Sequence, residues 1–350
     1  MPRQFWLDLA RAGARFPIGT DLVLHDHDNA ETIRMSGAAL GQVLAEAARR
    51  WRIPAAMPLM DLRLEKADLA SIFGVNFERA ESWHLDAAPE PSAIARVADP
   101  IRSFPAENRA QQHSLRWLAT NTDLLPVGMS IGPFSLMTKL LADPITPVAM
   151  SGSGSTANED PGVALVERCL ELAEAAIHRS IRTQVSAGAR AIMICEPAAN
   201  TTYLSPRQLR KGAATFHRYV LEPNLRLKAF LDDSGIDLIF HDCGELLAGM
   251  VEAFARRIHP AVLSLGSSRN LWEDAALVPE DVVLYGNLPT KTFYSDDAMP
   301  LARVEEISRD LLARMRATGH LHILGSECDV LHVPDAAATI RRKVDAMLSV

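Results

Sequence analysis

Residues 160–196 read DPGVALVERCLELAEAAIHRSIRTQVSAGARAIMICE, and this stretch decides the fold class. Its first part, Asp160–Ala187, carries apolar residues at helical spacing with Glu and Arg between them, which predicts a long amphipathic helix. The apolar run Ala191–Cys195 follows after a short turn. An uninterrupted run of this kind is typical of a strand that is buried on both faces of a parallel sheet. The stretch therefore predicts a helix–strand unit of an α/β protein.

Similar units occupy the rest of the chain. The candidate strands are Ile18–Leu24, Pro54–Met60, Pro126–Ile131, Ala191–Cys195, Asp237–Phe240, Ala261–Leu265, Val282–Tyr285 and Leu321–Leu324. Further helices are expected from a Ser205 N-cap to about Leu231, and over Glu245–Arg257, Leu301–Thr318 and Pro334–Leu348. Eight strands that alternate with helices predict a (β/α)8 TIM barrel, formed as a single domain over residues 1–350. A doubly wound open sheet is the alternative, but no G-x-G-x-x-G follows a strand.

Two segments exceed a minimal barrel. Gly74–Leu124 is polar and contains proline, and we expect it to decorate the N-terminal part of the barrel. Asp143–Gly162 is rich in Gly, Ser and Pro, which predicts a mobile loop after the third strand. In a barrel such a loop lies over the mouth, so it is either a lid or a surface insertion.

The composition limits the class of protein. Of 350 residues, 36 are Lys or Arg and 43 are Asp or Glu, giving a net charge of −7, and no long basic cluster suggests nucleic-acid binding. No apolar run is long enough to cross a membrane, and the charged N-terminus lacks the apolar core of a secretory signal. We therefore expect a cytoplasmic protein whose four cysteines are free thiols or metal ligands.

A candidate metal site lies at two strand ends. His241 and Cys243 follow the run Asp237–Phe240, and Cys328 follows Leu321–Leu324. In a parallel barrel, residues just beyond the strands converge on one face. One imidazole and two thiolates suit Zn²⁺, and three protein ligands leave a position for water or substrate, as in catalytic zinc sites. The alternative is that the two cysteines pack as small apolar residues.

Other polar residues at strand ends are candidates for the same face. Glu196 is predicted to be a further ligand, a proton carrier or a partner of His241, and the alternative is an ion-paired rim residue. Asp61 also ends a strand and is a candidate catalytic carboxylate. Asn287, in the turn after Val282–Tyr285, either contacts a bound ligand or ties loops together.

Several residues are assigned no chemistry. Cys169 and Cys195 lie within a predicted helix and a predicted strand, which indicates core packing. Asp242 and Asp329 flank the candidate ligands and should point away from them, because neighbouring residues on a strand face opposite ways. The motif HDHD at residues 25–28 is expected to be a solvated loop.

Five segments in order resemble the uroporphyrinogen decarboxylase superfamily, and within it the zinc-dependent corrinoid methyltransferases typified by methylcobalamin:coenzyme M methyltransferase. They are MPLMDLRLEKADLASIFGV (57–75), PVGMSIGPFSLMTKLL (126–141), AGARAIMICEPAANTTYLSP (187–206), VVLYGNLPT (282–290) and GSECDVLHVPDAAATIRRKVDAM (325–347). The methyltransferase branch's H-x-C-G and distant Cys correspond to His241, Cys243 and Cys328.

This resemblance implies a TIM barrel that moves a methyl group between a small substrate bound at Zn²⁺ and a corrinoid. The chain has no corrinoid-binding D-x-H-x-x-G, so the cobalamin would arrive on a partner protein, and a homodimer is possible by analogy. The alternatives are a metal-free decarboxylase, whose arginine-rich motif the segment 11–17 does not match, and a non-catalytic corrinoid-binding barrel. In related zinc enzymes of methionine synthesis an acidic ligand follows the sixth strand, where this chain has Gly266-Ser267-Ser268.

Overall fold

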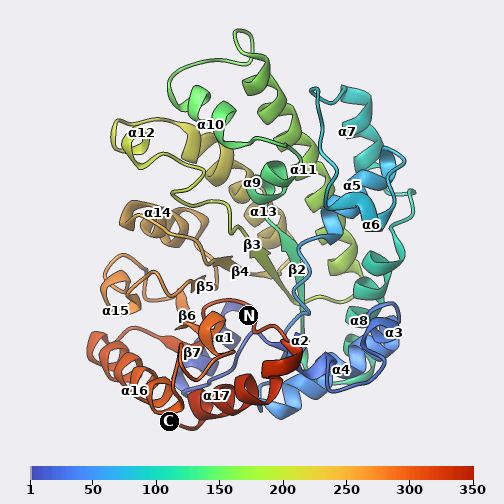
Figure 1. Cartoon of the computed structure of the whole chain (residues 1–350). Helices are drawn as coiled ribbons and strands as arrows, with labels where there is room; N and C mark the ends of the chain where they lie inside the picture. Colours follow the sequence, from blue (N-terminus) through green and yellow to red (C-terminus); the bar gives the residue numbers. More distant parts are fainter. Residues whose placement is uncertain (1) are drawn as a thin grey trace.

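The computed structural model describes residues 2–350 and contains one curled sheet of seven parallel strands (Figure 1). The strands pair in chain order: β1 Ala55–Ala56, β2 Leu125–Ile131, β3 Ala191–Cys195, β4 Asp237–Asp242, β5 Val262–Leu265, β6 Val283–Leu288 and β7 His322–Ser326. Every adjacent pair is parallel. The predicted α/β class with a barrel-like parallel sheet is therefore confirmed.

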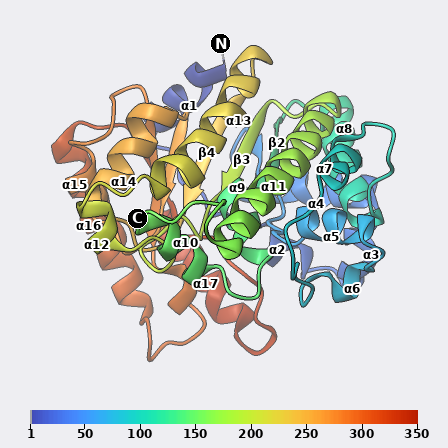
Figure 2. The ribbon, with the colours of Figure 1, turned by 90° about the horizontal axis from the view of Figure 1, so that it is seen from above.

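Helices surround the outer side of the sheet, and Figure 2 shows α11 and α13 lying across β2–β4. The helices are α1 Pro2–Arg11, α2 Thr20–Leu24, α3 Ala30–Arg34, α4 Gly37–Arg50, α5 Leu64–Ile72, α6 Phe77–Ala80, α7 Pro91–Ala98, α8 Ala106–Asn121, α9 Pro133–Lys139, α10 Ile145–Gly152, α11 Pro161–Ser186, α12 Pro206–Arg210, α13 Glu222–Asp233, α14 Ala248–Ala253, α15 Leu271–Asp274, α16 Leu301–Thr318 and α17 Ala337–Ser349. Short π or 3₁₀ turns are η1 His217–Leu221, η2 Phe254–Ile258, η3 Thr290–Thr292 and η4 Pro334–Ala336. None of the helices between residues 2 and 350 combines the length and apolar character of a membrane span.

The two faces of the strands build two apolar clusters. Met193 and Cys195 of β3 belong to the cluster inside the curled sheet, together with Ile239 of β4. Ile194 and Phe240 belong to the cluster between the sheet and its helices. This alternation follows from the two-residue period of a strand, and it decides which side chains at the strand ends turn toward the centre of the barrel.

The predicted strand Ile18–Leu24 is wrong, because most of it forms helix α2. The eighth position is occupied by the irregular segment 15–18, which forms isolated parallel bridges to Leu324 and Asp329. Pro17 has no N–H to donate, which removes one ladder hydrogen bond from this short segment. On its other side Thr20 Oγ1 donates to Met57 O at 3.0 Å, next to β1. An irregular segment thus takes the place of the predicted strand.

The predicted helices Asp160–Ala187 and Leu301–Thr318 are confirmed as α11 and α16. Ser205 caps α12 as expected, because its Oγ accepts from Gln208 N at 3.4 Å. The helix predicted to continue to about Leu231 is interrupted, since α12 ends at Arg210 and Gly212 has a φ of +85°. The sequence after Gly212 re-enters helix through η1 and α13.

The predicted helix Pro334–Leu348 corresponds to η4 and α17, and Glu245–Arg257 to the shorter α14 and η2. The segment Asp143–Gly162 is not one continuous loop, because α10 takes up its first half. Helices α6, α7 and α8 lie within Gly74–Leu124.

One buried carboxyl group makes the stability of this scaffold pH-dependent. Glu65 of α5 is 1% exposed, and its Oε1 accepts from Ser180 Oγ of α11 at 2.9 Å. Its Oε2 is buried without a hydrogen-bond partner among the described residues. Burial raises the pKa of Glu65 from 4.5 to about 7.

We predict that Glu65→Gln removes part of the pH dependence of unfolding. Because the folded pKa is raised, the native state keeps a proton that the unfolded chain releases, so the contribution of Glu65 to stability falls as pH rises from 4.5 toward 7 and then levels off. The variant should match wild type near pH 5 and exceed it by roughly 3 kcal/mol at pH 8. Urea unfolding at both pH values measures this difference. Exposed Glu306→Gln is the control, and equal pH slopes for wild type and Glu65→Gln would contradict the prediction.

Candidate metal centre

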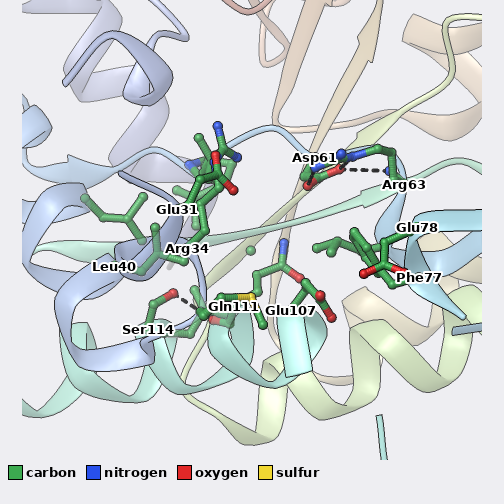
Figure 3. Close-up of a pocket in the computed structure, with 18 residues that line it drawn as sticks. Glu31, Arg34, Leu40, Asp61, Arg63, Phe77, Glu78, Glu107, Gln111 and Ser114 are labelled. Atoms are coloured by element: carbon green, nitrogen blue, oxygen red, sulfur yellow. Dashed lines mark hydrogen bonds and ion pairs between the residues drawn. The ribbon is translucent and has the colours of Figure 1, made fainter. Parts of the chain in front are cut away.

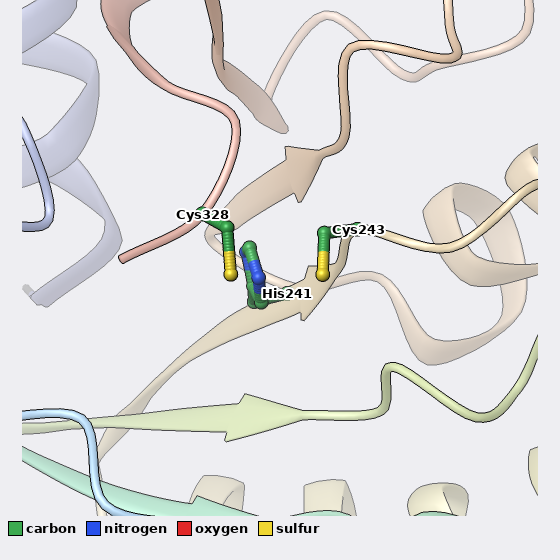
Figure 4. A group of neighbouring side chains, drawn as sticks. All are labelled: His241, Cys243 and Cys328. Carbon is green, nitrogen blue, oxygen red and sulfur yellow. The ribbon is translucent and has the colours of Figure 1, made fainter. Parts of the chain in front are cut away.

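The structure brings together the three residues that the sequence predicted as metal ligands. One donor atom each of His241, Cys243 and Cys328 lies within 4.8 Å of the other two (Figure 4). His241 stands near the end of β4, Cys243 directly follows β4, and Cys328 follows β7. Within residues 2–350 no other group of three His, Cys, Asp or Glu residues comes this close.

Strand alternation turns His241 toward the inside of the sheet. Ile239, two residues earlier, belongs to the inner apolar cluster, whereas Phe240 belongs to the outer one. His241 therefore shares the inner face with Ile239, and only 1% of it is exposed.

The imidazole has one nitrogen bound and one free. His241 Nδ1 lies 2.8 Å from Ser264 Oγ, and Ser264 is its register partner on β5. His241 Nε2 is buried and has no hydrogen-bond partner among the described residues. When Nδ1 donates its proton to Ser264, Nε2 presents a lone pair, which is the form of histidine that binds a metal ion. A buried nitrogen without a partner is costly, and a metal ion would satisfy it.

The two thiols are coupled and differ from the other cysteines. The hydrogen bond from Cys243 and the nearby His241 ring lower the pKa of Cys328, whereas the same bond and burial raise the pKa of Cys243. The pair therefore favours a thiolate on Cys328. By contrast, burial raises the pKa of Cys169 to about 12 and that of Cys195 well above its ordinary value. Both are fully buried, as the sequence predicted.

Two charged residues that the sequence analysis did not single out border the thiols. Burial lowers the pKa of Lys291, but the charges of the nearby Cys243, Cys328 and Glu327 outweigh it and raise this pKa overall. Glu327 is 5% exposed, accepting from Lys291 N at 3.2 Å and from Ser267. The loops after β5, β6 and β7 are thus tied together beside Cys328.

Glu196 does not join the three donors. It follows β3 in phase with Ile194, so its side chain lies on the helix side of the sheet. Its oxygens accept from Phe134 N at 3.2 Å, Ser135 N at 2.9 Å and Asn224 Nδ2 at 2.8 Å. Burial raises the pKa of Glu196 despite these bonds. The contacts tie the start of α9 to α13, and a catalytic role for Glu196 stays a prediction.

Asp61 and Asn287 also lie outside the group of three. Asp61 forms a two-point ion pair with Arg63, at 2.8 and 2.6 Å, and lines a cavity beside α8. Asn287 lies within β6 and not in the predicted turn; its Nδ2 donates to Gly266 O at 2.8 Å and to Arg269 O at 2.9 Å, so its amide ties β6 to the loop after β5. The predicted roles of Asp61 in catalysis and of Asn287 in cofactor binding stay predictions.

The two aspartates that flank the ligands behave differently. Asp242 lies in phase with the outer cluster, as expected, and its Oδ1 accepts from Gly244 N at 2.8 Å. Both oxygens of Asp329 are shielded from solvent and have no hydrogen-bond partner among the described residues. The strand alternation used to place Asp329 does not apply, because β7 ends at Ser326.

The motif at residues 25–28 is anchored to its surroundings. The ring of His25 stacks on His332 with centroids 4.4 Å apart, and Asp26 pairs with Arg50 at 2.7 Å and with Arg341. These contacts hold the loop against α4 and α17. Asp26 and Asp28 are exposed and His25 and His27 are half-buried, so the prediction of a solvated loop is confirmed.

Comparison with known proteins agrees with this architecture. A family model described as uroporphyrinogen decarboxylase (URO-D) matches residues 48–347. The solved structure of a methyltransferase from Methanosarcina mazei superposes with a TM-score of 0.66, covering 99% of this chain and 98% of that one at 14% identity, which shows a shared fold. No curated protein sequence matches the chain. Because the family model spans most of its length, the chain belongs to the uroporphyrinogen decarboxylase family.

Proposed function

We propose that this protein is a zinc-dependent methyltransferase that moves a methyl group between a small substrate and a corrinoid carried by a partner protein. The observation that carries the proposal is the convergence of His241, Cys243 and Cys328, with donor atoms within 4.8 Å of one another. The fold shared with a methyltransferase from Methanosarcina mazei supports it. A metal-free decarboxylase would leave this donor set without a purpose.

The donor set fits zinc chemically. The free Nε2 of His241 and two sulfur atoms match the nitrogen and sulfur ligands that Zn²⁺ prefers, and three ligands leave a fourth position for substrate. Bound Zn²⁺ would activate a coordinated thiol, or polarise a methylated heteroatom, at neutral pH. No acidic residue from the loop after β5 belongs to the group, so that position stays available to the substrate.

The surrounding residues orient and balance this set. Ser264 holds the His241 ring so that Nε2 faces the sulfurs, and Lys291 offsets the negative charge of the thiolates. Cys243 and Cys328 are both partly exposed, so a substrate and the methyl-bearing partner can approach them from solvent.

One prediction of the proposed function concerns metal content. Protein purified with zinc should hold about one Zn²⁺ per chain, and Cys243→Ala or Cys328→Ala should lose most of it, because each removes one of three protein ligands. Elemental analysis of the purified variants measures this. Cys169→Ala, at a fully buried position in α11, is the control and should keep its zinc. Full zinc content in both ligand variants would rule out the proposed centre.

A second prediction tests the orientation of the imidazole. Ser264→Ala removes the hydrogen bond to His241 Nδ1 but no ligand, so zinc affinity should fall by roughly 10–100-fold while the stoichiometry at saturation stays the same. Competition with a chromophoric chelator measures the affinity. Ser308→Ala, at an equally buried serine of α16, is the control, and equal affinities in the two variants would contradict the positioning role.

A third prediction concerns the reaction. The zinc-loaded protein should demethylate free methylcobalamin in the presence of an acceptor from a panel of thiols, or methylate Co(I) corrinoid from a panel of methylated amines, ethers and thioethers. Corrinoid absorbance follows both directions. Cys328→Ala should be inactive, and Cys169→Ala should match wild type. Binding of methylcobalamin without turnover over the whole panel would instead favour a non-catalytic corrinoid-binding barrel.

A further inference from the structure

Beside α8 lies the cavity that Asp61 lines. It has a volume of about 280 Å³ and is enclosed by α3 and α4, the segment that leads from β1 into α5, α6 and α8 (Figure 3). None of His241, Cys243 and Cys328 lines it. Binding of a ligand in this cavity can therefore be tested independently of the function of the metal centre.

The inner part of this cavity is apolar. Leu40 and Leu44 of α4, Leu64 of α5 and Leu115 of α8 line it, and each is at most 4% exposed. Phe77 adds an aromatic wall from α6. A cavity of this size and lining favours a small ligand with an apolar body, because binding removes apolar surface from water on both sides.

The positive charges at the rim are already paired. Arg63 is engaged by both oxygens of Asp61, and Arg34 pairs with Asp21 at 2.7 Å and more distantly with Glu31. An anionic ligand would have to compete with these carboxylates for each guanidinium. The rim therefore offers no free cation among the residues that line it.

Two rim carboxylates have no such partner. Glu78 of α6 and Glu107 of α8 line the cavity. Glu78 is exposed and accepts from Asn76 Nδ2 at 3.2 Å, Glu107 is half-buried, and neither forms an ion pair within the described part of the chain. Figure 3 shows both beside Phe77 and Gln111 around the same hollow. We propose that this cavity binds a small organic cation, with its apolar body among the leucines and its ammonium group at Glu78 and Glu107.

Three probes with one ring and different charge test the proposal on the full-length protein. Benzylammonium, benzyl alcohol and benzoate share the apolar body and carry a positive, zero and negative charge. Isothermal titration calorimetry at low ionic strength should give benzylammonium an affinity at least about tenfold above that of benzyl alcohol, with benzoate weakest. Equal affinities for the three, tighter binding of benzoate, or no heat from benzylammonium at millimolar concentration would overturn it.

Substitutions of Glu78 and Glu107 test whether these two rim carboxylates cause the preference for a cation. The double variant Glu78→Gln/Glu107→Gln keeps side-chain size and removes both charges, so benzylammonium affinity should fall about fivefold or more. Glu107 lies in the first turn of α8, where a carboxylate favours the helix, so circular dichroism of the variant establishes that it is folded. Glu306→Gln on α16 is the matched control. An equal loss in the control, or unchanged affinity in the double variant, would refute the assignment.

This inference can fail separately from the proposed function. Zinc content and methyl transfer depend on His241, Cys243 and Cys328, whereas the probes report on Glu78 and Glu107. Benzylammonium titrated into Cys328→Ala should bind as in wild type. A loss of binding in that variant would show that the probe occupies the metal centre and would overturn the proposal of a separate site.

Discussion

The parallel register between β4 and β5 is the constraint on which the metal centre depends. It sets His241 opposite Ser264, so one hydrogen bond fixes the ring and leaves Nε2 toward the two sulfurs. A shift of the register by one residue would turn His241 to the helix side, because side chains alternate along a strand. The apolar residues on both faces of β4 resist such a shift, since every one of them would change face. The geometry of the donors thus follows from the packing of the sheet.

The centre carries the cost of several buried polar groups. His241 Nε2 and both oxygens of Asp329 are shielded from solvent without hydrogen-bond partners in residues 2–350. Unpaired buried groups are rare in folded proteins because each loses its hydration without compensation. Such atoms also occur away from the centre, as at Glu65 Oε2 and Asn108 Oδ1, but His241 Nε2 belongs to the group of three donors, where a bound metal ion would satisfy it.

Much of the fold was predictable from local patterns. Runs such as Ala191–Cys195 and helices such as Leu301–Thr318 were located closely, because continuous apolar runs and helical periodicity are local signals. The predicted strand Ile18–Leu24 failed because its apolar residues fill the core from an irregular segment and a short helix. The convergence of His241, Cys243 and Cys328 was predictable from strand ends alone. The hydrogen bond from His241 to Ser264 and the bonds of Glu196 to α9 and α13 were not predictable. The first depends on the register between two strands and the second on a side-chain direction, and the sequence alone gives neither.

The segment that replaces the eighth strand is also what holds Cys328 in place. Val330 N donates to Ile18 O at 2.7 Å, and His332 N donates to Asp21 Oδ2 at 2.8 Å, so both anchors of the chain beyond Cys328 come from this N-terminal region. In a regular strand the backbone carbonyls pair with the neighbouring strands in a continuous ladder. In the irregular segment, Ile18 O instead accepts from the loop after β7, and the Asp21 carboxylate of α2 binds both this loop and Arg34. The same N-terminal region therefore both closes the barrel and positions Cys328. Substitutions in residues 15–21 should therefore displace Cys328 more than His241, because β3 and β5 hold His241 independently of this segment.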